Sequence, residues 1–178
     1  TKSGDTYFED EKGQPWRCLH YVPNSVCYQQ VERPEQFYQS ALSFGHFLKQ
    51  LGDYPADSLY ETIPQFHDTA KRFRDFEDAQ RKDVKNRARL CHPEIEFVLS
   101  RKSDCNVLME QLEKGVLPLR VTHNDTKLNN ILFDKDTDQG LCIIDLDTIM
   151  PGLACNDFGD SIRFGASTAE EDEKDLDK

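Results

Sequence analysis

The side chains best suited to chemistry are four oxygen-bearing groups that flank two short apolar runs, 131–133 and 141–144. Two of them precede the first run and two follow the second: they are Asp125, Asn130, Asp145 and Asp147. The segment between the runs, 134–140, is rich in Asp and ends in Gly, which predicts the turn of a β-hairpin. Because a hairpin brings its two ends together, we expect the four side chains to meet in space.

These residue types are the ones that phosphoryl transfer from ATP requires. The reaction needs a carboxylate to accept the proton of the attacking hydroxyl, and an amide and a carboxylate as oxygen ligands for Mg²⁺. In kinases the Asn ligand follows the base by five residues, the spacing of Asp125 and Asn130, and the metal-binding Asp follows a later strand, as Asp145 does. Lys127 lies where its charge can reach the transferring phosphate. We assign Asp125 and Lys127 as catalytic and Asn130 and Asp145 as Mg²⁺ ligands.

Three motifs in this part of the chain resemble a known kinase family. They are Thr-His-Asn-Asp-Thr-Lys-Leu-Asn-Asn at 122–130, Ile-Asp-Leu-Asp at 144–147 and Asp-Phe-Gly-Asp-Ser-Ile-Arg at 157–163. The first two are similar to the aminoglycoside phosphotransferase and choline kinase family, and all three together are more similar to its N-acetylhexosamine 1-kinase branch. The resemblance extends from Trp16 to the C-terminus. It implies an α+β, protein-kinase-like fold, with ATP and Mg²⁺ as cofactors.

The resemblance also implies where the two substrates bind. Backbone groups of a hinge would hold the adenine of ATP; the residues assigned to it are Tyr21, Val22, Pro23 and Ser25. The residues assigned to the acceptor are Asn124, Asp147 and Arg163, and Arg163 could instead only pair with an acid. The favoured acceptor is a sugar, at the anomeric hydroxyl of an N-acetylhexosamine. Choline, homoserine and aminoglycosides are alternatives, although Asn124 replaces the Gly common in aminoglycoside kinases.

The same resemblance divides the chain into parts of two lobes. Residues 1–22 are expected to form the last hairpin of an N-terminal lobe, 23–28 a hinge, and 29–178 a mostly helical C-terminal lobe that is truncated at its C-terminus. No Gly-rich phosphate loop and no strand Lys with a helix Glu partner precedes the hairpin, so most of the lobe that covers ATP is missing. We therefore expect this chain to be a fragment that is inactive, or nearly so, by itself.

The elements that must position the site can be placed from hydrophobic periodicity. Alternation of apolar and polar residues predicts a strand over 16–22. Helical spacing of apolar residues, with start and stop signals, predicts helices over 34–51, 70–82, 105–114 and 156–164. A further helix is predicted to begin at Pro93. Asp68 or Thr69 can cap the second of these. Thr168 and Glu171 form a capping box, but only Leu176 follows as an apolar residue, which indicates an incomplete helix.

Two residues near the site are expected to be structural. Asp157-Phe158-Gly159 copies the kinase metal motif, but no apolar strand precedes it, so we expect Asp157 to cap the following helix or to brace the loop. The ring of His123 is expected to tie the loop to the segment around Asp145.

Composition excludes several classes of function. The net charge of −11 repels a phosphate backbone, so nucleic acid is not an expected partner. No apolar run approaches 18 residues, so no membrane partner is expected. Six scattered cysteines without a C-x-x-C pair favour free thiols and a cytoplasmic protein.

Two other classes of function stay open. A metal-dependent hydrolase could use His123, Asp125, Asp145 and Asp147, although such sites usually recruit more histidines. A non-catalytic binding or scaffold domain on a kinase-like fold is the third alternative. The intact set of Asp125, Asn130 and Asp145 argues against it.

Overall fold

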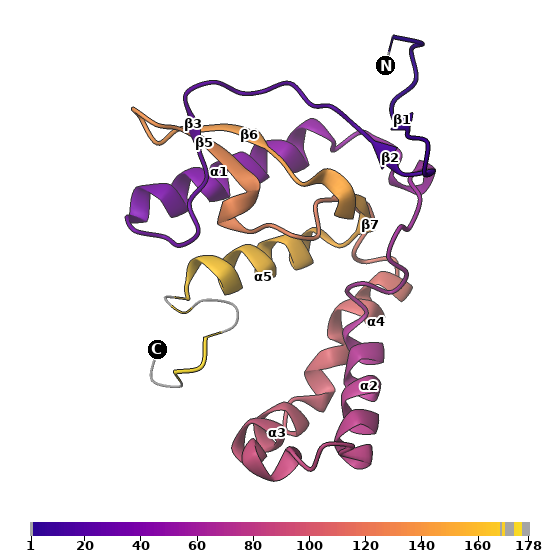
Figure 1. Cartoon of the computed structure of the whole chain (residues 1–178). Helices are drawn as coiled ribbons and strands as arrows, with labels where there is room; N and C mark the ends of the chain where they lie inside the picture. Colours follow the sequence, from indigo (N-terminus) through magenta and orange to yellow (C-terminus); the bar gives the residue numbers. More distant parts are fainter. Residues whose placement is uncertain (1, 168, 170–172, 176–178) are drawn as a thin grey trace.

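The predicted hairpin forms two of the three strands of an antiparallel sheet (Figure 1). The computed structural model describes residues 2–167, 169 and 173–175. In it, β5 (Ile131–Asp134) and β6 (Gly140–Ile143) pair across the predicted turn. Strand β3 (Ser25–Val26) pairs with the other edge of β5. The apolar runs on either side of an Asp- and Gly-containing turn therefore fold as the sequence predicts.

A second ribbon joins the chain before the hairpin to the chain after it. Strand β4 (Arg120–Thr122) pairs antiparallel with β7 (Met150–Gly152). The loop after β4 and the short 3₁₀-helix η5 (Leu146–Thr148) before β7 are consequently held close together. This ribbon brings the two ends of the predicted site toward each other.

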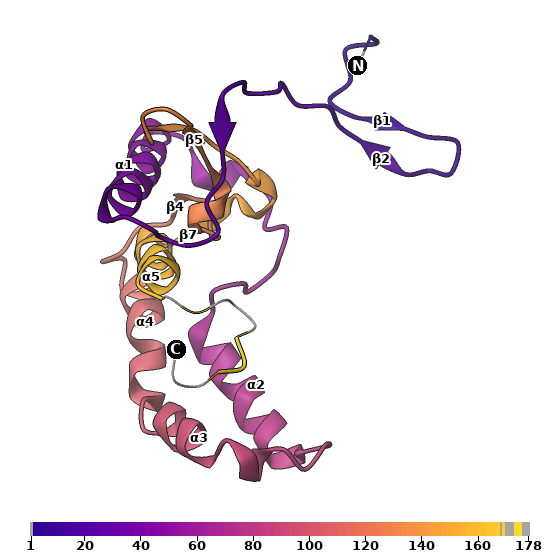
Figure 2. The same ribbon diagram turned by 60° about the vertical axis from the view of Figure 1, so that its left-hand side comes forward.

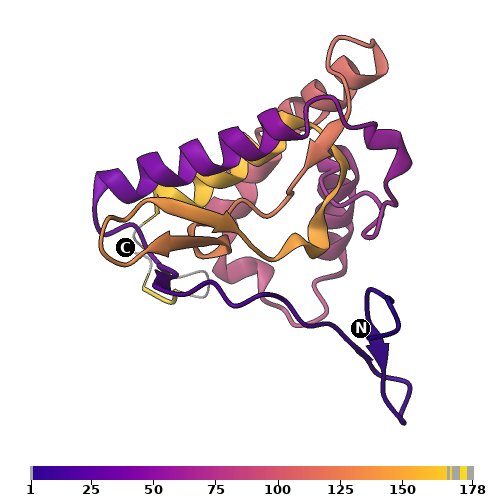
Figure 3. The same cartoon turned by 90° about the horizontal axis from the view of Figure 1, so that it is seen from above.

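Two helices flank the sheet and complete its core. Helix α1 (Pro34–Gln50) runs along the hairpin, and α5 (Ala154–Gly165) lies beside it (Figure 3). The helix predicted at 34–51 is confirmed, with Pro34 in its first turn as expected. The buried core joins three elements: Phe44 comes from α1, Leu128 from η4 (Leu128–Asn130), and Ile131 and Phe133 from β5. Phe133 has no exposed surface.

The remaining helices form an arm that extends from the sheet (Figures 1 and 2). They are α2 (Thr69–Lys82), α3 (His92–Leu99) and α4 (Val107–Glu113), joined through 3₁₀ turns that include η3 (Lys102–Asn106). The Asp68 carboxylate caps α2 by accepting from the Lys71 N–H at 2.8 Å. All predicted helices before the C-terminal tail are therefore present, with boundaries shifted by a few residues.

The N-terminal hairpin is shorter than predicted. Strands β1 (Phe8–Glu9) and β2 (Pro15–Trp16) pair with each other and lie apart from the sheet (Figure 2). The strand predicted over 16–22 is wrong beyond Trp16. Trp16 is 61% exposed and Tyr21 is 83% exposed, and an extended segment forms a strand only where a second strand accepts its hydrogen bonds.

Other expectations concern the cysteines, the membrane and the tail. All six cysteines are free thiols. No helix in the described part of the chain combines the length and the apolar composition that crossing a bilayer would require. The capping box of Thr168 and Glu171, together with Leu176, lies outside the described residues.

Two glycines on α5 provide a test of how tightly this helix packs on α1. A Cβ added at Gly165 would lie 2.0 Å from the Phe37 ring, whereas one at Gly159 would meet nothing within 4 Å. Gly165→Ala should therefore lower the free energy of unfolding by about 1–3 kcal/mol through overpacking. Gly159→Ala should raise it by about 0.5–1 kcal/mol through helix propensity. Urea unfolding of both variants measures the difference, and equal midpoints would contradict the packing.

Candidate active site

The site loop, residues 123–127, holds the predicted base in contact with two predicted partners. The Asn130 amide donates from Nδ2 to the backbone oxygen of Asp125 at 2.8 Å and to its Oδ2 at 2.9 Å. The ammonium of Lys127 lies 3.4 Å from the other carboxylate oxygen of Asp125. The structure therefore brings Asp125 and Asn130 together, as expected, and places Lys127 beside Asp125; their roles in catalysis and metal binding stay predictions. The carboxylate is three-quarters buried, yet still reachable from solvent.

Asp145 lies at the end of the hairpin, and its side chain has no bonding partner among the described residues. The Ile144 N–H donates to the backbone oxygen of Asn130 at 2.9 Å, so Asp145 follows directly after a residue bound to Asn130. Its backbone is left-handed, with φ 58° and ψ 56°, a conformation that costs a non-glycine residue energy and is concentrated at functional sites. Its exposed carboxylate makes no hydrogen bond or ion pair within the described residues.

The donor set of Asn130 and Asp145 fits Mg²⁺. Because Asn130 Nδ2 faces the two oxygens of Asp125, its Oδ1 remains as the available amide acceptor. An amide oxygen and an unpaired carboxylate are the hard oxygen ligands that Mg²⁺ prefers, with water and phosphate oxygens filling the other positions. These two residues could therefore hold the ion that the kinase hypothesis requires.

A buried carboxylate on α5 anchors the site loop. Asp157 is 2% exposed, and its two oxygens accept from the backbone N–H groups of His123 at 2.9 Å and Asn124 at 2.8 Å. Burial raises the pKa of Asp157 above its ordinary value of 3.8, while these two N–H donors act in the opposite direction. Asp157 thus braces the loop, which confirms one of the two roles expected for it.

The ring of His123 ties the site loop to the hairpin, as expected. Its Nε2 lies 3.0 Å from the backbone oxygen of Ile144, so Nε2 carries the proton and donates. The ring is fully buried, and Phe44 and Phe47 contact it edge-on at centroid distances of 5.4 and 5.8 Å. His123 therefore fixes the distance between the loop and the residue before Asp145.

The side-chain amide of Asn124 is hydrogen-bonded within the protein. It is 4% exposed, and its Nδ2 donates to the backbone oxygen of Thr148 at 2.9 Å while its Oδ1 accepts from the Thr122 hydroxyl at 3.0 Å. A Cβ on Gly152 would lie 2.9 Å from that Oδ1 and 2.2 Å from the Thr122 hydroxyl, so only glycine fits there. The structure gives Asn124 a structural role, and its contact with substrate stays a prediction.

Asp147 is not joined to the other predicted site residues. Its carboxylate pairs with Arg17 on the N-terminal segment at 2.6 Å. Within the described residues, no three His, Cys, Asp or Glu side chains gather as a metal-binding group. The expectation that all four oxygen-bearing side chains converge was therefore too broad, because η5 turns Asp147 toward the N-terminal segment. The same pair, together with the buried ring of His123, removes two of the four residues that a metal-dependent hydrolase would use.

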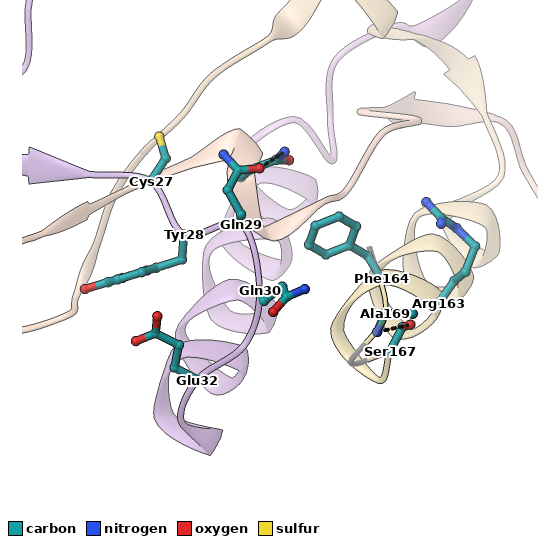
Figure 4. A pocket seen from close by; sticks show the side chains of 10 residues that line it. Cys27, Tyr28, Gln29, Gln30, Glu32, Arg163, Phe164, Ser167 and Ala169 are labelled. Carbon is teal, nitrogen blue, oxygen red and sulfur yellow. Dashed lines mark hydrogen bonds between the residues drawn. The ribbon is translucent and has the colours of Figure 1, made fainter. Parts of the chain in front are cut away.

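A cavity of about 800 Å³ opens beside the site loop, between the segment 27–32 and the C-terminal half of α5 (Figure 4). Amide, guanidinium and aromatic side chains line it: Tyr28, Gln29, Gln30, Asn129, Arg163 and Phe164. Asn129 adjoins Asn130 and donates to Gln29 at 3.1 Å. Arg163 donates from Nε to Asp160 at 3.0 Å. Arg163 therefore pairs with an acid and also lines the cavity, and its contact with substrate stays a prediction.

The residues predicted to hold adenine lie in an irregular segment that leads into β3. The Ser25 hydroxyl donates to the backbone oxygen of Val22 at 2.7 Å, which closes a tight turn around Pro23. The ring of Tyr21 points to solvent. No bond links this segment to Asp125 or Asp145, so its nucleotide contacts stay a prediction.

Sequence reasoning missed two further residues that hold the site loop. The Thr126 N–H donates to Asp160 at 2.8 Å, and the Thr148 hydroxyl donates to the backbone oxygen of His123 at 2.7 Å. Asp160 follows Asp157 by three residues on the same helix, and that spacing could have revealed it as a second acceptor on one face. Thr148 carries no comparable signal, because its partner is a backbone group 25 residues away.

Comparison with known proteins adds an independent finding. The chain matches a family model described as "Phosphotransferase enzyme family" over residues 6–176. The match includes the site loop, the hairpin and α5.

The loop anchor can be tested with an isosteric substitution. Asp157→Asn places an NH₂ group against one of two backbone N–H donors, so it should lower the free energy of unfolding by about 2 kcal/mol or more. It should also speed hydrogen exchange at the amides of His123 and Asn124. The control is Asp75→Asn, which removes an exposed pair with Lys71 on α2 and should leave the free energy of unfolding close to its wild-type value. An equal cost for the two variants would show that Asp157 is not the anchor.

Proposed function

Because the chain belongs to this phosphotransferase enzyme family, we propose that it carries the phosphoryl-transfer site of an ATP- and Mg²⁺-dependent small-molecule kinase. One observation supports this most directly. The Asp125 carboxylate is bound by the Asn130 amide in a loop whose backbone is held by a buried acid, with the unpaired Asp145 carboxylate one residue beyond a direct bond to Asn130. A fixed base beside two oxygen ligands is the arrangement that phosphoryl transfer needs.

The chemistry assigned to the chain's own residues is proton transfer and charge placement. Asp125 accepts the proton of the acceptor hydroxyl as its oxygen forms a bond to the γ-phosphorus of ATP. The bond from that phosphorus to the β–γ bridging oxygen breaks, and ADP leaves with the electron pair. Lys127, beside Asp125, supplies positive charge near the transferring group. Mg²⁺, when held by Asn130 and Asp145, neutralises phosphate charge as it develops.

The cavity in Figure 4 is the proposed place for the acceptor. Its lining includes Asn129, the neighbour of Asn130 in the chain. Its amide and guanidinium groups can hydrogen-bond several hydroxyls, while the rings of Tyr28 and Phe164 offer apolar faces. Such a mixture suits a polyhydroxylated ligand better than a quaternary amine, which would seek an aromatic cage. Together with the sequence resemblance, it supports a sugar, and an N-acetylhexosamine phosphorylated at its anomeric hydroxyl, as the acceptor.

The nucleotide is proposed to lie against the segment that leads into β3. We assign residues 1–22 to the last hairpin of an N-terminal lobe, 23–28 to the hinge and the rest to a helical C-terminal lobe. The exposed rings on the first segment support this assignment, since Trp16 and Tyr21 have no covering element among the described residues.

Substitutions at the two carboxylates should separate chemistry from metal binding in the protein that carries this chain. Asp125→Ala should reduce kcat by about 10²–10⁴-fold with little change in nucleotide affinity, because it removes the base. Asp145→Ala should instead abolish Mg²⁺-dependent nucleotide binding, measured by titration calorimetry with and without the ion. Asp104→Ala, an exposed acid on the arm, serves as the control and should change neither. Wild-type turnover in both site variants would refute the assignment.

The acceptor can be identified by a phosphate-transfer screen with Mg-ATP. We expect transfer to N-acetylhexosamines, and little to choline, homoserine or aminoglycosides. The 1-O-methyl glycoside of the best sugar should be inert, because its anomeric hydroxyl is blocked. Transfer to that glycoside would place the reaction at another hydroxyl, and a preference for choline would exclude a sugar kinase.

A further inference from the structure

The loop before α2 crosses the site loop, and we propose that His67 on it is a positioning residue for the base Asp125; this inference rests on the proposed function. His67 Nε2 lies 3.0 Å from the backbone oxygen of Asn124. Because a carbonyl can only accept, Nε2 carries the proton and donates. That carbonyl belongs to the peptide unit that joins Asn124 to Asp125.

Control of this peptide unit decides where the base points. Asn124 has a left-handed backbone, with φ 66°, which alternative orientations of the peptide could relieve. Asp157 fixes the Asn124 N–H on one side of the residue. On the other side, the bond from His67 is the one hydrogen bond that the described residues give the Asn124 carbonyl. Rotation of this peptide would move the Asp125 carboxylate away from the Asn130 amide. At present Asn130 Nδ2 lies 2.9 Å from Asp125 Oδ2.

His67 is itself held by its neighbours in the chain. The next residue, Asp68, caps α2 with its carboxylate, so the backbone position of His67 is set by the start of that helix. The Phe66 ring packs against the His67 ring at a centroid distance of 4.6 Å. Arg72, one turn into α2, donates from Nε to the backbone oxygen of Phe66 at 2.6 Å. The donor is therefore presented by a fixed element.

The rest of the same loop also contacts the chain that follows Asp145. The Thr62 hydroxyl donates to the backbone oxygen of Asp147 at 3.4 Å, and the Ile63 N–H approaches the Met150 sulfur at 3.2 Å. The loop thus spans both sides of the site, with His67 at its end nearest the base. His67 thereby links the start of α2 to the site loop.

Two variants separate the hydrogen bond from the bulk of the ring. His67→Leu keeps comparable volume and removes the donor, and His67→Gln offers an amide N–H at a reach similar to that of Nε2. In the protein that carries this chain, His67→Leu should lower kcat by about 10–100-fold, since a small misplacement of a catalytic group is that costly. KM for both substrates should stay within about twofold, and His67→Gln should recover most of the loss. His46→Leu, at an exposed histidine on α1, is the matched control.

A second readout does not depend on turnover. In ¹H–¹⁵N spectra of the chain, His67→Leu should shift the amide of Asp125 and speed its hydrogen exchange, whereas His67→Gln should leave it near its wild-type position. Unchanged kcat and an unchanged Asp125 amide in His67→Leu would overturn the proposal, as would equal losses in the Leu and Gln variants. A wild-type protein without transfer to any acceptor would instead refute the proposed function, and the amide shifts would still decide the role of His67.

Discussion

The bond between the buried Asp157 carboxylate and two successive backbone N–H groups is the interaction on which the site depends. It holds His123 and Asn124 at 2.9 and 2.8 Å, and every other contact of the site loop assumes that backbone position. Removing water from a carboxylate is costly, so the charge is tolerable in this place only because the loop supplies both donors. Loop and anchor therefore require each other: the N–H groups lack another acceptor among the described residues, and the acid lacks another donor.

This arrangement assigns different tasks to the acids of one short region. Asp157 and Asp160, on one face of α5, accept hydrogen bonds from backbone N–H groups of the site loop, so their role is structural. Asp125 is oriented by an amide and a lysine but remains reachable, and Asp145 makes no bond within the described residues. This difference in role follows burial. The acids on α5 face the site loop and accept from its backbone N–H groups, whereas the carboxylates of Asp125 and Asp145 remain accessible to ligands. Under the proposed function, Asp125 and Asp145 are the acids left to meet Mg²⁺ and substrate.

Local patterns in the sequence were enough to predict the hairpin, the helices and the contact of Asp125 with Asn130, because each depends on residues close together in the chain. The prediction failed where the outcome depends on distant partners. The alternating stretch 16–22 forms no strand beyond Trp16, since nothing described pairs with it. Asp147 was expected in the site, but Arg17, 130 residues away, binds it. No local signal distinguishes an acid that meets a metal from one that meets an arginine.

The left-handed backbone of Asp145 sets stability against activity at a single position. An aspartate held at φ 58° carries about 1 kcal/mol or more of conformational strain that glycine would not. Asp145→Gly would relax the chain and, in the same step, delete the carboxylate that we propose as a Mg²⁺ ligand. Laboratory selection for thermal resistance alone would therefore favour glycine at this residue and lose the proposed ligand with the strain.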